Sequence, residues 1–411
     1  MKRLSVSLVF VALLLALSLM PAALPKDKQI TLENPIATGG AISCDTWVVL
    51  KDATGDGTTL FGKNSDRLPF DSQVLVYNEG REWESDSTLK LEYTEIPQAD
   101  RTYATMGSSP YWCWGYEMGV NEMGVVAGNE AIYTKQHEIE PARGLVGMDL
   151  LRLGLERGAT AREALGVMTD LLEEYGQWGS ATPTKSDEEG SYDNSYLIAD
   201  RNEAWILETS GRSWRAKRVG NGTASISNVP TLGEWDLSSG NEIETNWLNM
   251  ISISGKTRER RSSALLGSKR DLEGMMEIAR DHRAIPGICM HTIPVVSEWE
   301  TVASMIVVLP ADGSIEVWWA AGRPCSSVYV PFSFGEVPDM VSKAGKSVTA
   351  ASKVEQDSFS ESSYWWLLHE RGNEGLKELE KEFIAGKDSA KDKKEYTERC
   401  LNRVLEEIGA A

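Results

Sequence analysis

The sequence predicts an α+β protein in which antiparallel sheets and helices form separate layers. Short strand-like runs follow one another between turns rich in Gly and Asp, and the helical segments come in pairs. A parallel sheet would require strands and helices to alternate along the chain, so the layered class fits better. A highly charged segment with helical periodicity near the C-terminus predicts a helical tail packed on this core.

The first two predicted strands form a hairpin. Apolar residues fill 47–50 and 58–61, and the intervening Asp52-Ala-Thr-Gly-Asp-Gly57 has the composition of a turn. Similar short runs recur further along the chain. They predict strands at 102–106, 124–127, 196–199, 204–208, 223–227, 304–309 and 315–319.

Helical periodicity is clearest between the strand runs. Residues 147–155 and 161–174 carry apolar side chains at i, i+3 and i+4 spacing, and Thr160 is placed to cap the second helix. Shorter helices are predicted at 262–266 and 272–281. From about residue 358 the charged tail keeps a helical period as far as Val404.

Composition and charge limit the class of partner. The chain has 411 residues, 41% hydrophobic and 25% charged, which is ordinary for one large domain or two medium ones. Its formal net charge is −19 and its pI is near 4.8. Because such a surface repels phosphate backbones, nucleic acid is not expected as a partner.

The N-terminal residues have the composition of a secretory signal. Lys2 and Arg3 precede an uncharged apolar run, and the small residues Pro21-Ala-Ala23 follow it. We therefore expect a signal peptide at 1–23 and an exported protein. Since the apolar run is somewhat long for a signal, an uncleaved segment that tethers the protein to a membrane is the alternative.

The cysteines are sparse and odd in number. No two of the five share the spacing of metal ligands, so the sequence indicates neither a disulfide framework nor a zinc site, and we expect no metal or other cofactor. At least one cysteine must stay unpaired. The five are Cys44, Cys113, Cys289, Cys325 and Cys400.

Cys44 is the strongest candidate for a nucleophile. Among the four histidines none forms a recognisable motif with a cysteine, and His291 has the best context. Cleavage of the Ser43–Cys44 bond would supply another base, since a free α-amine has a pKa of about 7.7–8.0. Two alternatives remain: 41–44 resembles a lipobox, whose cysteine is acylated, and Cys44 could be a merely buried thiol.

Several separate blocks of the sequence then point to one family. They include Cys44-Asp-Thr-Trp47, Phe61-Gly-Lys-Asn-Ser-Asp-Arg67, Trp114-Gly-Tyr-Glu-Met-Gly-Val-Asn121 and Gly124-Val-Val-Ala-Gly-Asn-Glu-Ala131. In this order they resemble the secernin/dipeptidase family of N-terminal-nucleophile hydrolases, from Cys44 to roughly residue 332. The resemblance implies a four-layer αββα sandwich of two antiparallel sheets, removal of residues before Cys44, and metal-free hydrolysis of short peptides or similar acyl-amides.

More distant similarity to bile-salt hydrolases and penicillin V acylases implies roles for individual residues. Asp66 would orient the Cys44 amine, and the Asn129 amide would bind the oxyanion. Asn228 would position the amine and the tetrahedral intermediate. Lys63 stands where those relatives carry arginine, which leaves its role open because lysine makes no bidentate contact.

The resemblance also implies an arginine beside the thiol, near the start of a helix. Arg258, Arg260 and Arg261 compete for this position, and an Arg-x-x-Arg match favours Arg258. The alternative for all three is an exposed, charged helix start.

The sequence thus predicts a propeptide at 24–43, a catalytic domain at 44–340 and a charged helical extension at 341–411. We expect a self-processing cysteine dipeptidase whose partner is a small peptide substrate. The alternatives are an N-acyl-amide hydrolase on the same scaffold and a non-catalytic exported binding protein. Substrate specificity and oligomeric state, homo-oligomers included, stay open.

Overall fold

A computed structural model describes most of the chain from residue 43 onward. The predicted signal peptide and residues 24–42 of the predicted propeptide lie outside the described residues, as does part of the predicted tail. In the part that is described, no helix has the length and apolar character needed to cross a membrane. The structure describes 43–409 except 70, 138–143, 183–184, 248, 285, 293–297, 339–340, 342–363, 365–367, 369–370 and 374.

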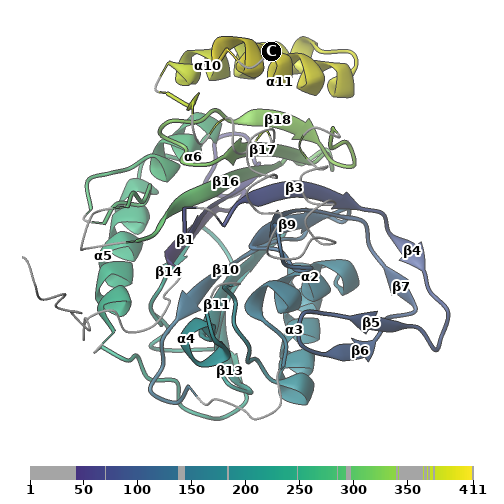
Figure 1. Cartoon of the computed structure of the whole chain (residues 1–411), viewed down its shortest axis with the longest axis vertical. Coiled ribbons are helices and arrows are strands. Elements are labelled where there is room, and N and C mark those ends of the chain that lie inside the picture. Colours follow the sequence, from purple (N-terminus) through teal and green to yellow (C-terminus); the bar gives the residue numbers. More distant parts are fainter. Residues whose placement is uncertain are drawn as a thin grey trace, which may run out of the picture. The chain divides into compact units, whose positions relative to one another are not determined.

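The first sheet contains six antiparallel strands (Figure 1). In spatial order the strands are β14 (Thr223–Ser227), β1 (Ser43–Val49), β2 (Thr59–Arg67), β16 (Glu300–Leu309), β17 (Glu316–Ala321) and β18 (Val330–Ser333). Cys44 is the second residue of β1, which pairs with β2 on one side and with β14 on the other, so both edges of this strand are hydrogen-bonded.

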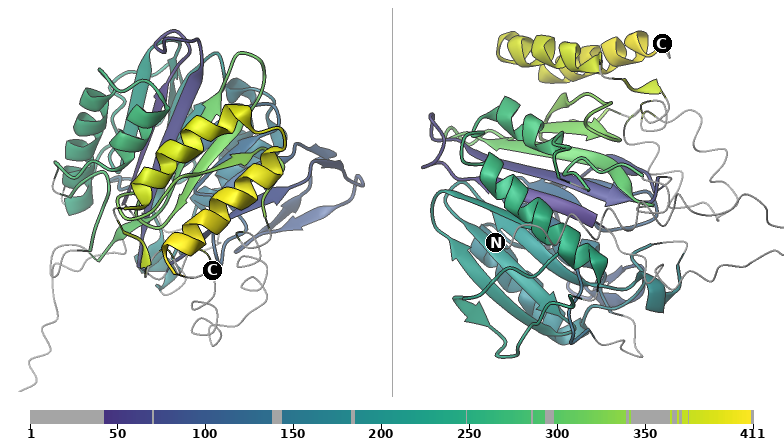
Figure 2. Two further views of the ribbon diagram at one scale, coloured as in Figure 1. Left: turned by 90° about the horizontal axis from the view of Figure 1, so that it is seen from above. Right: turned by 90° about the vertical axis from the view of Figure 1, so that its left-hand side faces the viewer.

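The second sheet contains eight antiparallel strands, and its inner face packs on the first sheet through β10, β11 and β3. Figure 2 (right) shows the two sheets stacked one above the other. In spatial order the strands are β15 (Leu237–Ser238), β13 (Ser213–Val219), β12 (Ala204–Ser210), β11 (Asp193–Ala199), β10 (Val126–Ile132), β9 (Met118–Asn121), β8 (Thr105–Pro110) and β3 (Gln73–Asn78). Two small hairpin-like pairs, β4 (Arg81–Glu82) with β7 (Arg101–Thr102) and β5 (Thr88–Lys90) with β6 (Glu95–Pro97), lie beside it.

Helices cover the outer face of each sheet. On the eight-stranded sheet lie α2 (Gly147–Arg157) and α3 (Ala161–Tyr175), whose predicted Thr160 cap accepts from the Glu163 amide. On the six-stranded sheet lie α5 (Met250–Leu265) and α6 (Leu272–Ala279). A short α4 (Asp187–Gly190) precedes β11. The predicted αββα sandwich is therefore confirmed.

The tail adds two helices that lie side by side, as Figure 2 (left) shows. They are α10 (Leu376–Gly386) and α11 (Lys393–Glu407), joined by the short helix η2 (Lys387–Ser389). Both pack on β18, and apolar residues such as Phe383 and Leu401 join the core of the six-stranded sheet. A helical tail packed on the core is thus confirmed for the residues described.

Most predicted elements form and run longer in the structure, whereas strands β3, β9, β13 and β18 were not predicted. The hairpin of 47–50 and 58–61 forms the middle of β1 and the start of β2. One helix was predicted only at 262–266, whereas α5 begins at Met250. Its first half mixes Met and Ile with Ser, Gly, Lys and Thr, and the apolar residues do not follow a helical period.

Candidate active site

Strand β1 places the Cys44 thiol between the two sheets. Because side chains alternate across a strand, Cys44 and Thr46 share one face, and the Thr46 hydroxyl bonds Glu130 of the opposite sheet. Asp45 points to the other face, where Arg258 of α5 meets it at 2.6 Å. Cys44 has no exposed surface. Its sulfur and its backbone thus face different sets of polar groups.

Asn228 holds the backbone nitrogen of Cys44. This residue follows β14 directly, and the pairing of Asp45 with Ser227 brings it beside Cys44. Its Oδ1 accepts from the Cys44 amide at 2.7 Å and from the Ser43 hydroxyl at 3.1 Å. The structure therefore brings this predicted residue to the predicted cleavage bond.

Arg258 is the one of the three competing arginines that reaches the site. Its Nη1 donates to the Cys44 carbonyl at 3.3 Å, and its Nη2 donates to Asn228 Oδ1 at 2.7 Å. Arg260 is exposed, and Arg261 pairs with Asp281 instead. Arg258 lies in the middle of α5 rather than near its start, and it contacts the backbone of Cys44.

A glycine explains how α5 comes this close. A Cβ on Gly255 would lie 2.8–3.0 Å from the backbone of Asn228, so a larger residue would push the helix away. Arg258 follows one turn later on the same buried face, together with Ser252 and Ser262. Small residues in this stripe let a fully buried guanidinium span from the helix to the strand.

Asp66 lies opposite Ser43 in the pairing of β1 with β2. Its Oδ1 accepts from the Thr301 hydroxyl at 2.6 Å, and its Oδ2 is 3.8 Å from Arg258 Nη1. That Oδ2 is buried and has no hydrogen-bond partner among the described residues. Burial raises the pKa of Asp66 to about 8, although Arg258 opposes the shift. Oδ2 of Asp66 can therefore accept a further hydrogen bond.

Lys63 lies at the thiol itself. Its buried ammonium donates to the Asn129 carbonyl, and its charge lowers the pKa of the Cys44 thiol. Two buried carboxyl groups lie near the ammonium, Glu117 at 3.6 Å and Glu130 at 3.8 Å. Burial lowers the pKa of Lys63, but the charges of Cys44, Glu130 and Glu117 outweigh it and raise the pKa overall. The sequence left this lysine without a role, and the structure places its charge where it lowers the pKa of the thiol.

Asn129 contacts the site through its carbonyl, which accepts from Lys63, and through its side-chain amide, which contacts Glu117. Its neighbours on β10 face the first sheet: Glu130 bonds Thr46, and a Cβ on Gly128 would meet Lys63. The Asn129 side chain therefore points to the opposite face of the strand. With its amide nitrogen toward Glu117, it donates to a carboxylate oxygen and to the carbonyl of that residue, each at 3.0 Å. This geometry does not support the oxyanion role, which stays a prediction.

The intact chain keeps the thiol protonated. Burial raises the pKa of Cys44 to about 12; Lys63 lowers it, whereas Glu117, Asp66 and Glu130 raise it further. The thiolate is the reactive form of cysteine. The sulfur must therefore give up its proton when it attacks.

Apolar and aromatic side chains complete the surroundings of the thiol. Cys44 belongs to a buried cluster with Tyr192, Met290 and Trp299. Tyr133 and Trp112 pack against the same cluster and are only partly buried. An acyl group bonded to the sulfur would thus meet an apolar environment on this side.

The structure also groups residues that sequence spacing did not. His282, Cys289, His291 and Cys325 place their ligand atoms within 4.8 Å of one another, and so do Glu92, Cys113 and Asp149. The first set includes His291, which the sequence had offered as the best partner for a catalytic cysteine. Its nearest sulfurs are those of Cys325 and Cys289. Sequence spacing gave no signal, because the four residues come from three separate segments.

The fold and site define a class of protein: an αββα sandwich with a buried cysteine at the start of a central strand. Residues 43–246, just under half of the chain, match the model of peptidase family C69. A dipeptidase of Bifidobacterium longum is 30% identical over 210 residues, 43% of this chain and 35% of that protein. A probable dipeptidase A of Streptococcus pyogenes is 28% identical over 191 residues, 43% of this chain and 37% of that protein. The match thus spans about a third of the length of these relatives.

Two solved structures are similar at lower sequence identity. A mutant of the conjugated bile acid hydrolase from Clostridium perfringens is 13% identical, with a TM-score of 0.43 over 71% of this chain and 92% of that one. Penicillin V acylase from Agrobacterium tumefaciens is 10% identical, with a TM-score of 0.42 over 72% of this chain and 87% of that one.

Proposed function

We propose that this protein is an exported, self-processing hydrolase of peptide bonds, with dipeptides or short peptides as substrates. Cys44, freed as the N-terminal residue, supplies both the nucleophilic sulfur and the amine that accepts its proton. The match to peptidase family C69 and the two dipeptidase relatives support the class of reaction.

The observation that carries this proposal is the environment of the Cys44 nitrogen. In the intact chain its single N–H is satisfied by Asn228 Oδ1 at 2.7 Å. An ammonium group offers three protons, so it requires more acceptors than an amide does. Asp66 Oδ2, buried and without a hydrogen-bond partner in the described part of the chain, lies at the neighbouring strand position. The site is thus equipped for an amine that the intact chain does not yet have.

Self-processing follows from the same thiol. The Cys44 sulfur attacks the carbonyl carbon of Ser43, the bond from that carbon to the Cys44 nitrogen breaks, and the thiol proton ends on the new amine. Water then hydrolyses the thioester, which releases the preceding segment as a carboxylate and restores the thiol. The Ser43 hydroxyl and the Cys44 nitrogen both bond Asn228, so this residue holds both sides of the cleaved bond.

Peptide hydrolysis repeats these steps on a substrate. The amine takes the thiol proton as sulfur attacks the substrate carbonyl, and it returns that proton to the leaving amine. Lys63 stabilises the developing thiolate, because its buried positive charge lowers the pKa of the Cys44 thiol. The same amine then activates the water that releases the acid from the acyl-thioester.

A substrate screen on processed protein tests the reaction class. Purified protein with a free Cys44 N-terminus is assayed against a panel of dipeptides and a panel of N-acyl amides. The proposal predicts hydrolysis of dipeptides that is lost after thiol alkylation. Turnover of acyl amides alone would move the assignment to an acylase, and no turnover with a reactive thiol would favour a binding protein.

A further inference from the structure

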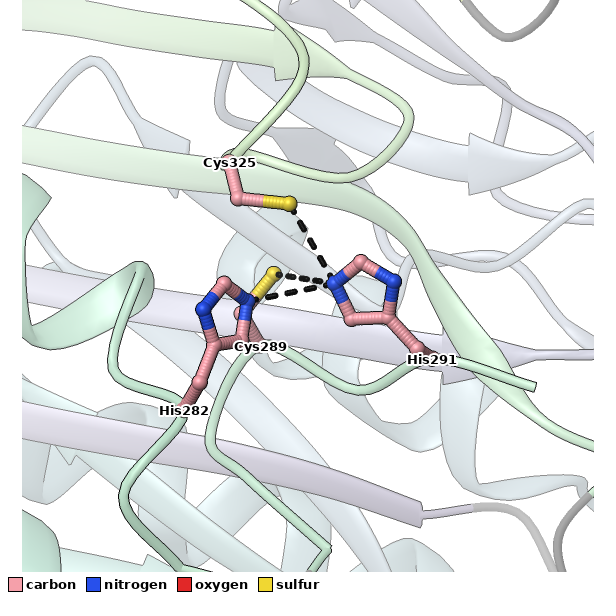
Figure 3. Close-up of side chains that lie close together, drawn as sticks. All are labelled: His282, Cys289, His291 and Cys325. Atoms are coloured by element: carbon pink, nitrogen blue, oxygen red, sulfur yellow. Dashed lines mark hydrogen bonds between the residues drawn. The ribbon is translucent and has the colours of Figure 1, made fainter. Parts of the chain in front are cut away.

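A second cluster of cysteine and histidine residues lies where three loop segments meet. His282 follows the end of α6, Cys289 and His291 precede β16, and Cys325 lies in the connection from β17 to β18. Figure 3 shows the four side chains pointing toward one another. None of them takes part in the chemistry proposed for Cys44.

The distances match those between the ligands of a tetrahedral zinc ion. With Zn–N of about 2.0–2.1 Å and Zn–S of about 2.3 Å, ligand atoms are separated by roughly 3.3 Å for N–N, 3.6 Å for N–S and 3.8 Å for S–S. Here His282 Nε2 and His291 Nε2 are 3.1 Å apart. From the same His291 Nε2, Cys325 Sγ lies at 3.3 Å and Cys289 Sγ at 3.8 Å.

Contacts among backbone and side chains hold these loops in place without a bound ion. The Cys289 amide donates to the Asp281 carbonyl at 3.1 Å, which closes the loop between His282 and Cys289. A Cβ on Gly287 would lie 2.9–3.1 Å from backbone atoms of this loop, so the closure depends on glycine. Arg280 donates to the Pro324 carbonyl at 2.7 Å and thus fixes the segment that carries Cys325. The ligand set is therefore preorganised.

We propose that His282, Cys289, His291 and Cys325 bind one zinc ion in a closed, structural site. Two sulfurs and two imidazoles in tetrahedral arrangement are the ligands that zinc prefers, and two thiolates neutralise its charge. Both cysteines are buried, whereas His282 is exposed and opens a path from solvent. Four protein ligands leave no position for substrate, so the ion stabilises the loops and takes no part in hydrolysis.

The site lies next to the surroundings of Cys44. Met290, between two of the ligands, packs in the apolar cluster of Cys44, and its amide donates to the Thr301 hydroxyl at 2.9 Å. That hydroxyl in turn donates to Asp66. Zinc would therefore fix a loop that borders the thiol. The binding proposal itself is independent of what Cys44 does.

Metal binding to the full chain tests the proposal directly. Protein purified under reducing conditions is stripped with a chelator and titrated with Co²⁺, a spectroscopic substitute for zinc. We expect one Co²⁺ per chain, with the visible bands of a tetrahedral site and a near-ultraviolet thiolate-to-cobalt band. Zn²⁺ should displace it. Absence of a thiolate-to-cobalt band in the folded, reduced wild type would overturn the proposal.

Single-ligand variants locate the ion. Cys325→Ser and His282→Gln should each weaken Zn²⁺ binding by about 100-fold or more, because each removes a ligand. Loss of a group that only hydrogen-bonds a ligand typically costs less, about 10–100-fold. Cys400→Ser and His137→Gln are matched controls and should bind like wild type. Unchanged cobalt spectra in both ligand variants would contradict the site. The site would also be contradicted if the protein is isolated without metal and with a Cys289–Cys325 disulfide, and still binds no Zn²⁺ after that disulfide is reduced. Circular dichroism checks that each variant is folded.

Discussion

Cys44 lies on a strand between two sheets among charged side chains, whereas Cys289 and Cys325 lie in loops and face two imidazoles. Around Cys44 a lysine, an arginine and several carboxyls are buried without exposed surface. Around the other pair the ligands that we infer are two neutral imidazoles and two thiols that lose their protons on binding an ion. In our proposals the first site moves protons and the second holds a cation.

The difference also concerns what fixes each geometry. Strand register places Asp66 opposite Ser43 and brings Asn228 beside Cys44, so hydrogen-bonded neighbours determine these positions. Three loop segments meet at the second cluster, and in our proposal an ion joins them. Cysteines of one chain can therefore serve unrelated purposes, and changes at each site should have effects of different kind and size.

The largest effect is expected for the nucleophile. Cys44→Ala should abolish processing and lower hydrolysis by about 10⁴-fold or more, because one thiol performs both steps. Cys44→Ser should still process, with slower turnover, since a hydroxyl can perform the same acyl shift. Cys400→Ser, a buried cysteine of α11, is the control and should match wild type. Processed, active Cys44→Ala protein would remove Cys44 from the mechanism.

The next largest effect on turnover is expected for Asn228, and a smaller one for Asn129. Asn228→Ala should lower turnover by about 10²–10³, because misplacing the amine costs roughly this much. Asn129→Ala should cost less than about 10-fold, since its amide faces Glu117 and Asn194 instead of the thiol. Steady-state kinetics on folded, processed variants measure both. The reverse ranking would restore the oxyanion role that the family resemblance assigns to Asn129.

Buried carboxyls should make the unprocessed chain sensitive to pH. Burial raises the pKa of Asp66 and of Glu130 to about 8 each. At pH values between the ordinary pKa of these carboxyl groups and about 8, the folded chain keeps protons that the unfolded chain has lost. The free energy of unfolding should therefore fall as pH rises, by up to about 1.4 kcal/mol per pH unit and proton.

Urea unfolding of the Cys44→Ala chain between about pH 5 and pH 8 measures this slope. Asp66→Asn and Glu130→Gln should each make the curve flatter, and Glu298→Gln, on the surface, should leave it unchanged. Stability that increases over this range would show that these carboxyls are ionised in the folded chain.

The smallest effect on activity is expected for removal of the inferred zinc ion. Because a closed four-ligand site offers no position to substrate, chelation should change turnover at low temperature by less than about twofold. The midpoint of thermal unfolding should fall, and added Zn²⁺ should restore it. Loss of activity that zinc restores would make the ion part of the chemistry and erase the contrast between the two sites.

The sequence predicted about half of the described strands, the paired helices and the layered class, because period-2 and period-3.6 patterns survive in buried elements. It also named Asp66 and Asn228, which strand register brings beside Cys44, but it did not name Asp45 or Glu130. The sequence did not predict the cluster of His282, Cys289, His291 and Cys325. These four residues come together only because the chain closes a loop at Gly287 and Arg280 holds the segment of Cys325. The role of Asn129 could not be predicted for another reason: a motif specifies a residue, but the pleat of β10 decides which face its side chain occupies.

The mature N-terminus tests the central claim most directly. Intact-mass measurement of the purified wild type, combined with N-terminal sequencing, should give a chain that begins at Cys44. Cys44→Ala made in the same way should retain residues between the signal peptide and position 44. A wild-type protein that hydrolyses dipeptides while Cys44 stays in peptide linkage to Ser43 would contradict the account, because its base would not exist.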